Sequence, residues 1–452
     1  MNRNNIFETK SISQLIVLFS FPTICSLVLE SLTSMVDTAF AGHLSGISDK
    51  ALTAMGIISP VLLILIAAQL IFGVSTSIVI SKRLGENNQE KVNQTFEVGF
   101  YACFIFSITI SLFIFLFENN LLLLLGAKSE VFNLAKEYLN IAVIFNVFSS
   151  VGYMLLNIIR AFGYPKIEII VGVLSTIINI AFNILFTFVL NMGMKGIALS
   201  TLVSEIFYFG FSTIFLIKKK LWFRRSHGNF AESKEILISI VKIGFVQFLM
   251  QSLNSVSAFI INKVLIFYGS VSYVGAWSIC SNMNMVILLP LIGLTQGVQS
   301  IVAYFHSSQN KSKERSVKNK VLQYSLIYSI TVTLIVFIFT AEVLRVFTND
   351  MDLLKVTIPI MKIVVVGFPF LGLLYAVITF MQVSGKEDDA TKLELMRQIV
   401  LSMPLVIILP RIFLRYNIFN ISPQLSVFLA VPLSTFLLLI IYFRKIKNIL
   451  KE

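Results

Sequence analysis

Long apolar runs recur along this sequence, and each is long enough to cross a lipid bilayer. A membrane-spanning helix needs about 20 predominantly apolar residues. Twelve runs meet that length, six in each half of the chain, near residues 12–39, 51–81, 92–117, 131–159, 167–190, 194–217, 236–268, 273–305, 317–340, 352–383, 391–410 and 421–443. Within lipid a spanning segment must satisfy its own backbone hydrogen bonds, which helices of this length do. The sequence therefore predicts an all-α polytopic membrane protein with twelve transmembrane helices.

The composition excludes a soluble protein with one aqueous core, since 56% of the residues are hydrophobic and the mean hydropathy is +0.86. The first apolar run is too long for a cleaved signal peptide and is followed by further spans, so we expect it to remain as the first helix. The three cysteines, Cys25, Cys103 and Cys280, fall inside apolar runs and are odd in number. We interpret them as packing residues and not as a disulfide framework.

The net charge of +13 is distributed in a way that favours a membrane over a nucleic acid as the partner. Basic residues concentrate in alternate loops, and Arg160 belongs to the same set; the densest segments are 82–91, 218–234, 311–320 and 444–451. By the positive-inside rule these loops face the cytoplasm. We therefore expect a multi-pass plasma-membrane protein with both termini cytoplasmic, whose basic loops also attract anionic lipid head groups.

The chain also repeats itself. Residues 73–92 and 297–316 share one pattern: an apolar stretch, a polar turn and a charged start to the next run. Arg160–Gly163 and Gln382–Gly385 both close an apolar run before a polar turn. Transporters are often built from such repeats, and copies with an even number of spans are related by an axis along the membrane normal. We expect two six-helix lobes with a pseudo-two-fold axis, at 1–217 and 236–452, joined by a cytoplasmic linker at 218–235.

Enzyme signatures are absent from the sequence. It holds no phosphate-binding loop of the G-x-x-x-x-G-K-[ST] type, no H-E-x-x-H zinc motif and no nucleophile with a base. The histidines His43, His227 and His306 all fall in predicted loops. We predict a protein that is not an enzyme, uses neither nucleotide nor cofactor, and draws any uphill transport from an ion gradient.

Acidic residues inside the apolar runs point to a site, because a charged side chain at the centre of a membrane helix costs about 2.5–3.5 kcal/mol on insertion scales. Asp37 and Glu30 lie in the first run, seven residues apart and so on roughly one helix face, and Glu205 lies near the middle of the sixth. We interpret Asp37 as functional. Glu30 and Glu205 are candidates for a substrate cavity, with packing roles as the alternative.

Neutral oxygens accompany Asp37. Asn179 and Asn183 are spaced i,i+4 in the fifth run, and Thr201 begins the sixth. Such oxygens suit a hard cation, such as Na⁺, or the hydrogen bonds of a carboxylate. The alternative is that they bridge helices, as Asn and Thr commonly do in membranes.

The second half carries amides where the first carries acids. Gln251 and Asn254 lie in the seventh run and Asn282 in the eighth. Amides can hydrogen-bond a varied ligand but cannot take up a proton near neutral pH. We list these three residues as candidates for a substrate cavity.

Taken together, several short motifs resemble those of the multidrug and toxic compound extrusion (MATE) transporters. The matching segments are Phe21-Pro22, Val36-Asp37-Thr38, Gly42-His43-Leu44, Ala51–Gly56, Arg160–Gly163, Asn179–Asn183 and Gly196–Thr201. The resemblance covers the whole chain and implies a cation-coupled antiporter that exports drugs or metabolites. It also implies an ion site at Asp37, Asn179, Asn183 and Thr201, and a bend of the first helix at Pro22.

The sequence departs from the pattern of that family in two respects. Some members carry Asp at the position of Asn183, and others carry Glu near the position of Asn254 together with an Asp in the tenth span, whose core holds no acid here. We therefore expect ion coupling in the first lobe alone, with Asp37 as its carboxylate.

Our hypothesis from the sequence is a monomeric antiporter that exchanges an amphiphilic, cationic small molecule for H⁺ or Na⁺ by alternating access. The alternative within transport is a flippase for a lipid-linked oligosaccharide or another amphiphile. Twelve spans, without an obvious cluster of cations in the cavity, favour the antiporter.

Overall fold

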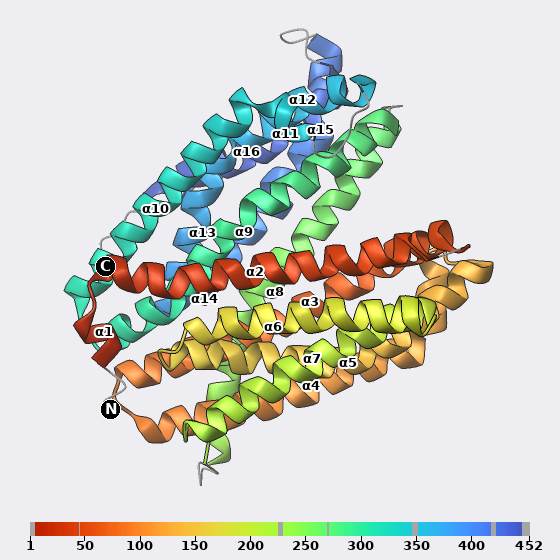
Figure 1. The fold of residues 1–452 in the computed structure, drawn as a ribbon. Helices are drawn as coiled ribbons and strands as arrows, with labels where there is room; N and C mark the ends of the chain where they lie inside the picture. Colours follow the sequence, from red (N-terminus) through yellow and green to blue (C-terminus); the bar gives the residue numbers. More distant parts are fainter. Residues whose placement is uncertain are drawn as a thin grey trace. The chain divides into compact units, whose positions relative to one another are not determined.

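The computed structural model describes residues 5–44, 46–224, 229–268, 271–345, 351–416 and 422–444, and every regular element among them is a helix (Figure 1). The first part of the chain forms α1 (Asn5–Thr9), α2 (Ile12–Gly42), α3 (Ser48–Gly85), α4 (Gln89–Leu124), α5 (Ser129–Ala161), α6 (Lys166–Asn183), a π-helical turn η1 (Ile184–Val189) and α7 (Gly193–Lys218). The second part forms α8 (Phe230–Phe267), α9 (Val271–Ser307), α10 (Lys311–Ile338), α11 (Thr340–Leu344), α12 (Met351–Val366), α13 (Phe368–Val383), α14 (Glu387–Leu395), a π-helical turn η2 (Met396–Ser402), α15 (Met403–Tyr416) and α16 (Pro423–Ile441).

The predicted fold class is confirmed. By length and composition, eleven helical segments of the described chain can cross a membrane, and a twelfth span results if α12 and α13 are taken together. These two helices, predicted as one run at 352–383, are bent by 43° relative to each other. The break falls at Gly367, where a Cβ atom would lie 2.9 Å from the Cα of Pro432, so a larger residue there would displace α16. Pro369 then occupies the first turn of α13, where a missing N–H is tolerated.

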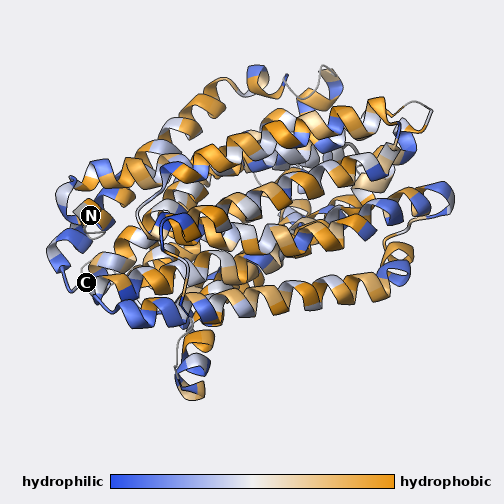
Figure 2. Cartoon of the chain, turned by 60° about the horizontal axis from the view of Figure 1, so that its bottom comes forward, coloured by the Kyte–Doolittle hydropathy of each residue, from blue (hydrophilic) through white to orange (hydrophobic). Residues whose placement is uncertain are grey.

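The apolar and polar residues are arranged as expected for a protein surrounded by lipid. On α4, Ile105, Leu116 and Leu124 are 62%, 67% and 83% exposed, whereas Ser111 and Asn146 are buried and hydrogen-bonded to each other at 2.9 Å. Figure 2 shows the hydrophobic residues along the lengths of the helices and many hydrophilic residues at the turns. Lipid tails are as apolar as these side chains, so their exposure carries no penalty.

The turns that end α3 and α9 have the same construction. Asn87 and Gln309 adopt positive φ values of 56° and 55°, which close each helix in a left-handed cap. The next residues, Asn88 and Asn310, accept hydrogen bonds from the backbone N–H groups of Lys91 and Lys313 and so cap α4 and α10. The repeat seen in the sequence therefore extends to the hydrogen bonds of its turns.

The chain divides into two compact units. The first unit comprises Met1–Lys10 and Val17–Phe248, and the second comprises Ser11–Ile16 and Leu249–Glu452. The division falls inside α2 and inside α8, so two continuous helices run from one unit into the other. Each unit is described by itself below.

Two basic residues that the sequence places among the loop charges are buried ion-pair partners in the structure. The Arg160 side chain is 1% exposed and pairs with Glu168 at 3.1 Å, and that of Lys318 is 1% exposed and pairs with Glu314 at 2.6 Å. Both lie within helices, Arg160 next to the last residue of α5 and Lys318 seven residues after the start of α10. The expectation that His306 lies in a loop is also wrong, because it belongs to the last turn of α9; His227 lies outside the described residues.

Candidate functional site

The first unit brings three polar side chains onto the carboxylate of Asp37. Its Oδ2 atom accepts a hydrogen bond of 2.7 Å from the hydroxyl of Thr201 on α7. Its Oδ1 atom accepts 2.9 Å and 3.5 Å bonds from the amides of Asn183 and Asn179 on α6. The two amides are one turn apart and also bond to each other at 3.1 Å, so the i,i+4 spacing places both on one face of α6. The four residues predicted as an ion site therefore meet at one point inside the helices.

This cluster is buried and carries a single formal charge. Asp37 is 4% exposed, and Asn179 and Asn183 are completely buried. A buried carboxylate needs hydrogen bonds or a counter-charge, and Asp37 accepts its hydrogen bonds from the neutral donors Asn179, Asn183 and Thr201. One proton or one monovalent cation would neutralise it, whereas a divalent ion would leave an uncompensated positive charge.

Two buried oxygens on the segment that carries Asn183 have no hydrogen-bond partner: Oδ1 of Asn183 itself and Oγ1 of Thr187. Thr187 follows Asn183 by four residues and lies in the π-helical turn η1, which begins directly after Asn183. Such turns often occur at functional sites. The oxygens of Asp37, Asn179, Asn183 and Thr201 form an oxygen-rich set of the kind that hard monovalent cations take. A group of three or more His, Cys, Asp or Glu residues, as a transition metal would need, is absent from the described residues.

Tyr138 on α5 is a neighbour of this cluster that the sequence analysis missed. Its side chain lies close to both Asp37 and Thr201 and is 3% exposed. Its ring belongs to an apolar cluster that includes Ala41 and Ile197. Ala41 lies one turn after Asp37 on α2, and Ile197 lies one turn before Thr201 on α7. One Tyr among 13 gives no local signal that would single it out.

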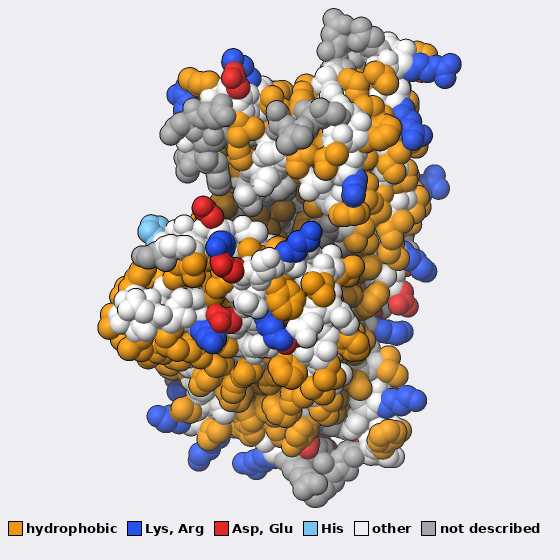
Figure 3. Space-filling view, turned by 90° about the vertical axis from the view of Figure 1, so that its right-hand side faces the viewer, with side chains coloured by type: hydrophobic (Ala, Val, Ile, Leu, Met, Phe, Trp, Pro, Cys, Tyr) orange, Lys and Arg blue, Asp and Glu red, His pale blue; other side chains and the backbone are white. Residues whose placement is uncertain are grey.

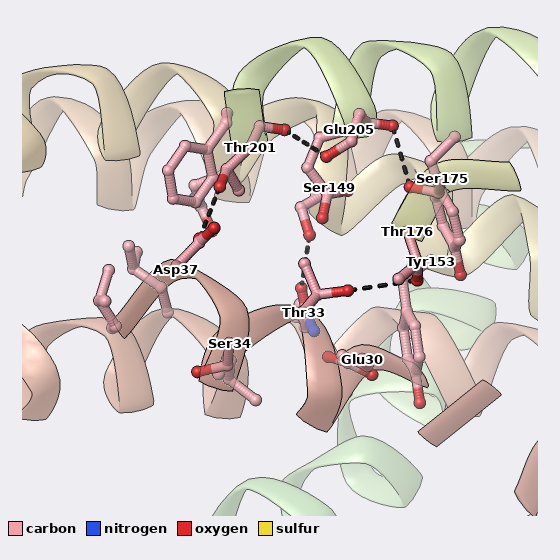
Figure 4. A pocket seen from close by; sticks show the side chains of 18 of the residues that line it. Glu30, Thr33, Ser34, Asp37, Ser149, Tyr153, Ser175, Thr176, Thr201 and Glu205 are labelled. Atoms are coloured by element: carbon pink, nitrogen blue, oxygen red, sulfur yellow. Dashed lines mark hydrogen bonds between the residues drawn. The ribbon is translucent and has the colours of Figure 1, made fainter. Parts of the chain in front are cut away.

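A cavity of about 190 Å³ opens beside Asp37 and Thr201 within the first unit. Figure 4 shows Asp37 and Glu30 on the same helix, α2, with Glu205 across from them. Glu30 and Glu205 both line this cavity, as predicted from their positions in the apolar runs. They are partly accessible, in contrast to the buried Asp37, so the cavity has one enclosed carboxylate and two that face its open space.

Two tyrosines form much of the remaining wall, and glycines on neighbouring helices make room for them. A Cβ atom on Gly73 would lie 2.4 Å from the ring of Tyr153, and one on Gly152 would lie 2.7 Å from the ring of Tyr208. These close approaches let α3, α5 and α7 pack while both rings reach the cavity.

A second buried polar network in the first unit joins α2 to α5 and α6. Arg160 donates to Glu168 at 3.1 Å and to the hydroxyl of Thr23 at 2.7 Å, and it also bonds to Asn157. Thr23 directly follows Pro22, the helix-interior proline of α2. This network holds the part of α2 that follows Pro22. The sequence does not reveal it, because the charge pattern groups Arg160 with the basic loops.

In the second unit, Asn254 on α8 is exposed and accepts a 2.8 Å hydrogen bond from Gln398 in η2. Gln398 in turn accepts a 2.8 Å bond from Ser257. Gln251 lies half-buried one turn before Asn254, and Asn282 is exposed on α9. The structure therefore joins Asn254 to Gln398, a residue that was not predicted.

The second unit also contains a buried acid that the sequence analysis missed. Glu394 is completely buried and accepts a 2.5 Å hydrogen bond from Arg397, which is 6% exposed. Both residues belong to the start of the eleventh span, where α14 passes into η2. The second unit is thus not limited to amides, but its acid already has a basic partner.

The fold and the family of this chain are shared with known transporters. Solved structures with closely similar folds include a MATE protein in the bent conformation, with a TM-score of 0.89 over 100% of this chain and 98% of that one. Another is the outward-facing conformation of a multidrug resistance MATE family transporter, with a TM-score of 0.88 and the same coverage. Each is 20% identical in sequence to this chain.

Curated relatives include the multidrug export proteins MepA of Staphylococcus saprophyticus and Staphylococcus haemolyticus. They are 24% and 25% identical to this chain, over 92% and 97% of its length and 90% and 94% of theirs. The family model MatE matches residues 22–185 and 243–408, one segment in each half of the chain. The chain therefore belongs to the MatE family, a family of membrane transporters and not of enzymes.

Proposed function

We propose that this protein is a secondary antiporter that exports amphiphilic, cationic drugs or metabolites in exchange for H⁺ or Na⁺. The observation that carries the proposal is the Asp37 carboxylate, buried within a membrane-spanning helix and bound only by neutral donors beside a cavity. The names of the MepA relatives support drug export.

Coupling follows from the competition of two states of Asp37. When Asp37 is ionised, Asn179, Asn183 and Thr201 turn their donors toward it, as in this structure. A proton on Asp37 turns one of its oxygens into a donor, and a bound Na⁺ draws the oxygens of these side chains inward in place of their donors. Either change alters the packing of α2 against α6 and α7. If the substrate prefers one packing arrangement, ion and substrate each lower the other's affinity by the same factor.

The substrate space is the cavity that adjoins this site. Glu30 and Glu205 supply negative charge to a cation, and the rings of Tyr153 and Tyr208 supply apolar and cation–π contacts. In the second lobe, Gln251, Asn254 and Asn282 supply amides for the rest of the ligand. We propose that the two lobes, 1–217 and 236–452, alternate access around the substrate while the linker 218–235 stays cytoplasmic with both termini.

Purified protein in proteoliposomes tests the proposal with ethidium as the transported cation. An imposed pH gradient and an imposed Na⁺ gradient, applied separately, distinguish the two coupling ions. We expect one of them to drive ethidium movement in the parent protein and Asp37→Asn to abolish that movement. The matched control is Asp49→Asn, which removes an exposed carboxylate from the first turn of α3 and should leave the rate unchanged. Gradient-driven movement that survives in Asp37→Asn would disprove the mechanism.

A further inference from the structure

The first residues after α7 fold back against the membrane-spanning helices. Lys220 adopts a positive φ of 55°. The N–H groups of Lys220 and Leu221 donate to the carbonyls of Ile217 and Leu216, at 2.9 Å and 2.8 Å. This pair of bonds is a Schellman cap, which ends a helix and reverses the chain. The linker therefore starts with a fixed direction and not as a loose tail.

The reversal places two aromatic residues of the linker on α4. The Phe223 ring lies 5.1 Å from that of Phe96, and the Trp222 ring lies 5.4 Å from that of Phe100. Tyr101, which contacts Phe223 at 6.1 Å, is 51% exposed. Trp and Tyr concentrate where the bilayer meets water. This aromatic cluster therefore marks the level of the membrane surface on the first unit.

Four cationic side chains surround that cluster: Lys218, Lys219, Lys220 and Arg224, all exposed. Within the described part of the chain none of the four has an acidic partner, and Lys219 instead contacts an aromatic ring, with its Nζ 5.8 Å from the centre of the Tyr164 ring. Four positive charges in seven residues repel one another unless an anion lies among them.

At the other end of the first unit, lysines have acidic partners. Successive helices alternate in direction, so the turns before α3, α5 and α7 lie at the end opposite the linker. There, Lys50 pairs with Glu130, Lys136 with Glu118 at 3.0 Å, and Lys195 with Glu137 at 3.5 Å. On the face drawn in Figure 3, acidic and basic side chains likewise lie side by side among hydrophobic ones. At the linker end Arg83 also has an acidic partner, Glu86, at 2.9 Å, so among the described residues the contrast concerns the four cations of the segment 218–224.

We propose that Lys218, Lys219, Lys220 and Arg224 bind the head groups of anionic phospholipids, with Trp222 and Phe223 setting their depth. The phosphate groups supply the charge that the chain lacks at this end. The acyl chains lie along the apolar face of α4 that continues from the cluster, where Phe104 and Ile105 are 41% and 62% exposed. The bound lipids anchor the start of the linker between the two halves of the transporter.

The chain offers its own reporter for this contact. It contains two tryptophans, and Trp277 belongs to the second unit, packed on Phe428. Trp277→Phe leaves Trp222 as the only indole. The full-length variant is reconstituted in nanodiscs that contain equal amounts of phosphatidylcholine and phosphatidylglycerol, with bromine atoms on the chains of one lipid or the other. Quenching of Trp222 by each brominated lipid then measures which lipid lies beside the linker.

We expect brominated phosphatidylglycerol to quench Trp222 at least about twice as strongly as brominated phosphatidylcholine, because each lysine near the surface adds to the attraction. In Lys218→Gln/Lys219→Gln/Lys220→Gln the ratio should fall to about one. The matched control, Lys311→Gln/Lys313→Gln/Arg315→Gln, removes the same charge from α10 in the second unit and should keep the parent ratio. Equal quenching by both lipids in the parent would overturn the proposal.

Two further measurements cover the remaining outcomes. If Trp277→Phe does not fold, the protein with both tryptophans is melted in nanodiscs with and without phosphatidylglycerol. The lipid should then raise the melting temperature of the parent and of the α10 control more than that of the linker variant; equal shifts would contradict the proposal. Millimolar inorganic phosphate should leave the quenching ratio unchanged. If phosphate abolished the preference for brominated phosphatidylglycerol, the linker would bind a free anion and not a lipid.

Discussion

Glu168 in the first turn of α6 and Glu394 near the end of α14 are both buried beside an arginine, in helices that follow glycine turns of positive φ at Gly163 and Gly385. The arginines come from different places. Arg160 reaches Glu168 from α5 and also bonds to Thr23 on α2, whereas Arg397 is three residues from Glu394 on the same helical stretch.

The consequence is a difference in what each ion pair connects. The pair in the first unit ties three helices together, one of which carries Asp37. The pair in the second unit is local and satisfies its charges within one segment. A duplicated scaffold can thus keep a buried acid in both copies and still give the acid a tertiary role in only one.

The largest expected effect comes from removing the arginine of each pair. Arg160→Met leaves Glu168 as an unpaired buried charge and should destabilise the protein by about 3–5 kcal/mol. Arg397→Met should destabilise it by less than Arg160→Met, because fewer bonds to other helices are lost. Unfolding in detergent with increasing sodium dodecyl sulfate measures both. The double variants Arg160→Met/Glu168→Gln and Arg397→Met/Glu394→Gln serve as controls and should recover much of each loss.

The comparison between the units would be wrong if Arg397→Met were the more harmful change. It would also be wrong if neither double variant were more stable than its single arginine variant, since the effect would then arise from lost packing and not from an unpaired charge.

A second contrast lies at the starts of α4 and α10, where the caps repeat but the buried side chains do not. Val92 and Phe96 are 1% exposed in α4. The residues at the same offset from the cap in α10 are Glu314 and Lys318, whose side chains pair at 2.6 Å, with His306 3.1 Å from Glu314. An apolar contact in one copy is replaced by an ionic one in the other.

This substitution can be tested by making α10 apolar. Lys318→Met alone leaves Glu314 with only the partly exposed His306 and should destabilise the protein by about 2–3 kcal/mol. Glu314→Leu/Lys318→Met should be within about 1 kcal/mol of the parent or more stable, since apolar replacements of buried ion pairs often are. Thermal melting of both variants in one detergent decides the matter. A double variant less stable than the single one would show that the ion pair is needed for the fold.

For simple physical reasons the sequence predicts the membrane-spanning runs and singles out Asp37, Asn179 and Asn183, whereas the meeting of these residues in one site was implied by the resemblance to the MATE family. An acid within an apolar run is costly, and amides spaced i,i+4 share a face, so Asp37, Asn179 and Asn183 stood out. Arg160 and Glu394 did not, because both lie near the ends of runs, where charges are usually solvated. Their burial depends on which helix packs over them, and that is a tertiary property.

The π-helical turn after Asn183 left no local signal. The residue types around Asn183 do not distinguish a π-helical turn from an α-helical one, so the position of Thr187 relative to Asn183 was not predictable. The break between α12 and α13 did have a signal in Gly367 and Pro369, but the apolar character of the run outweighed it.

The smallest expected effect tests the part of the repeat that has been kept. Asn88 and Asn310 cap α4 and α10 with hydrogen bonds of 3.0 Å and 3.2 Å to the backbone N–H groups of Lys91 and Lys313. Replacing an Asn cap with Ala costs about 1 kcal/mol. We therefore expect Asn88→Ala and Asn310→Ala to lower the stability of the protein by the same amount within error, although the side chains buried below the two caps differ. Melting of the two variants side by side measures this, with Asn88→Ser and Asn310→Ser as controls that retain a capping oxygen. Unequal losses would mean that the ion pair of α10 supports its own helix start, and that the two copies have diverged in local stability as well as in chemistry.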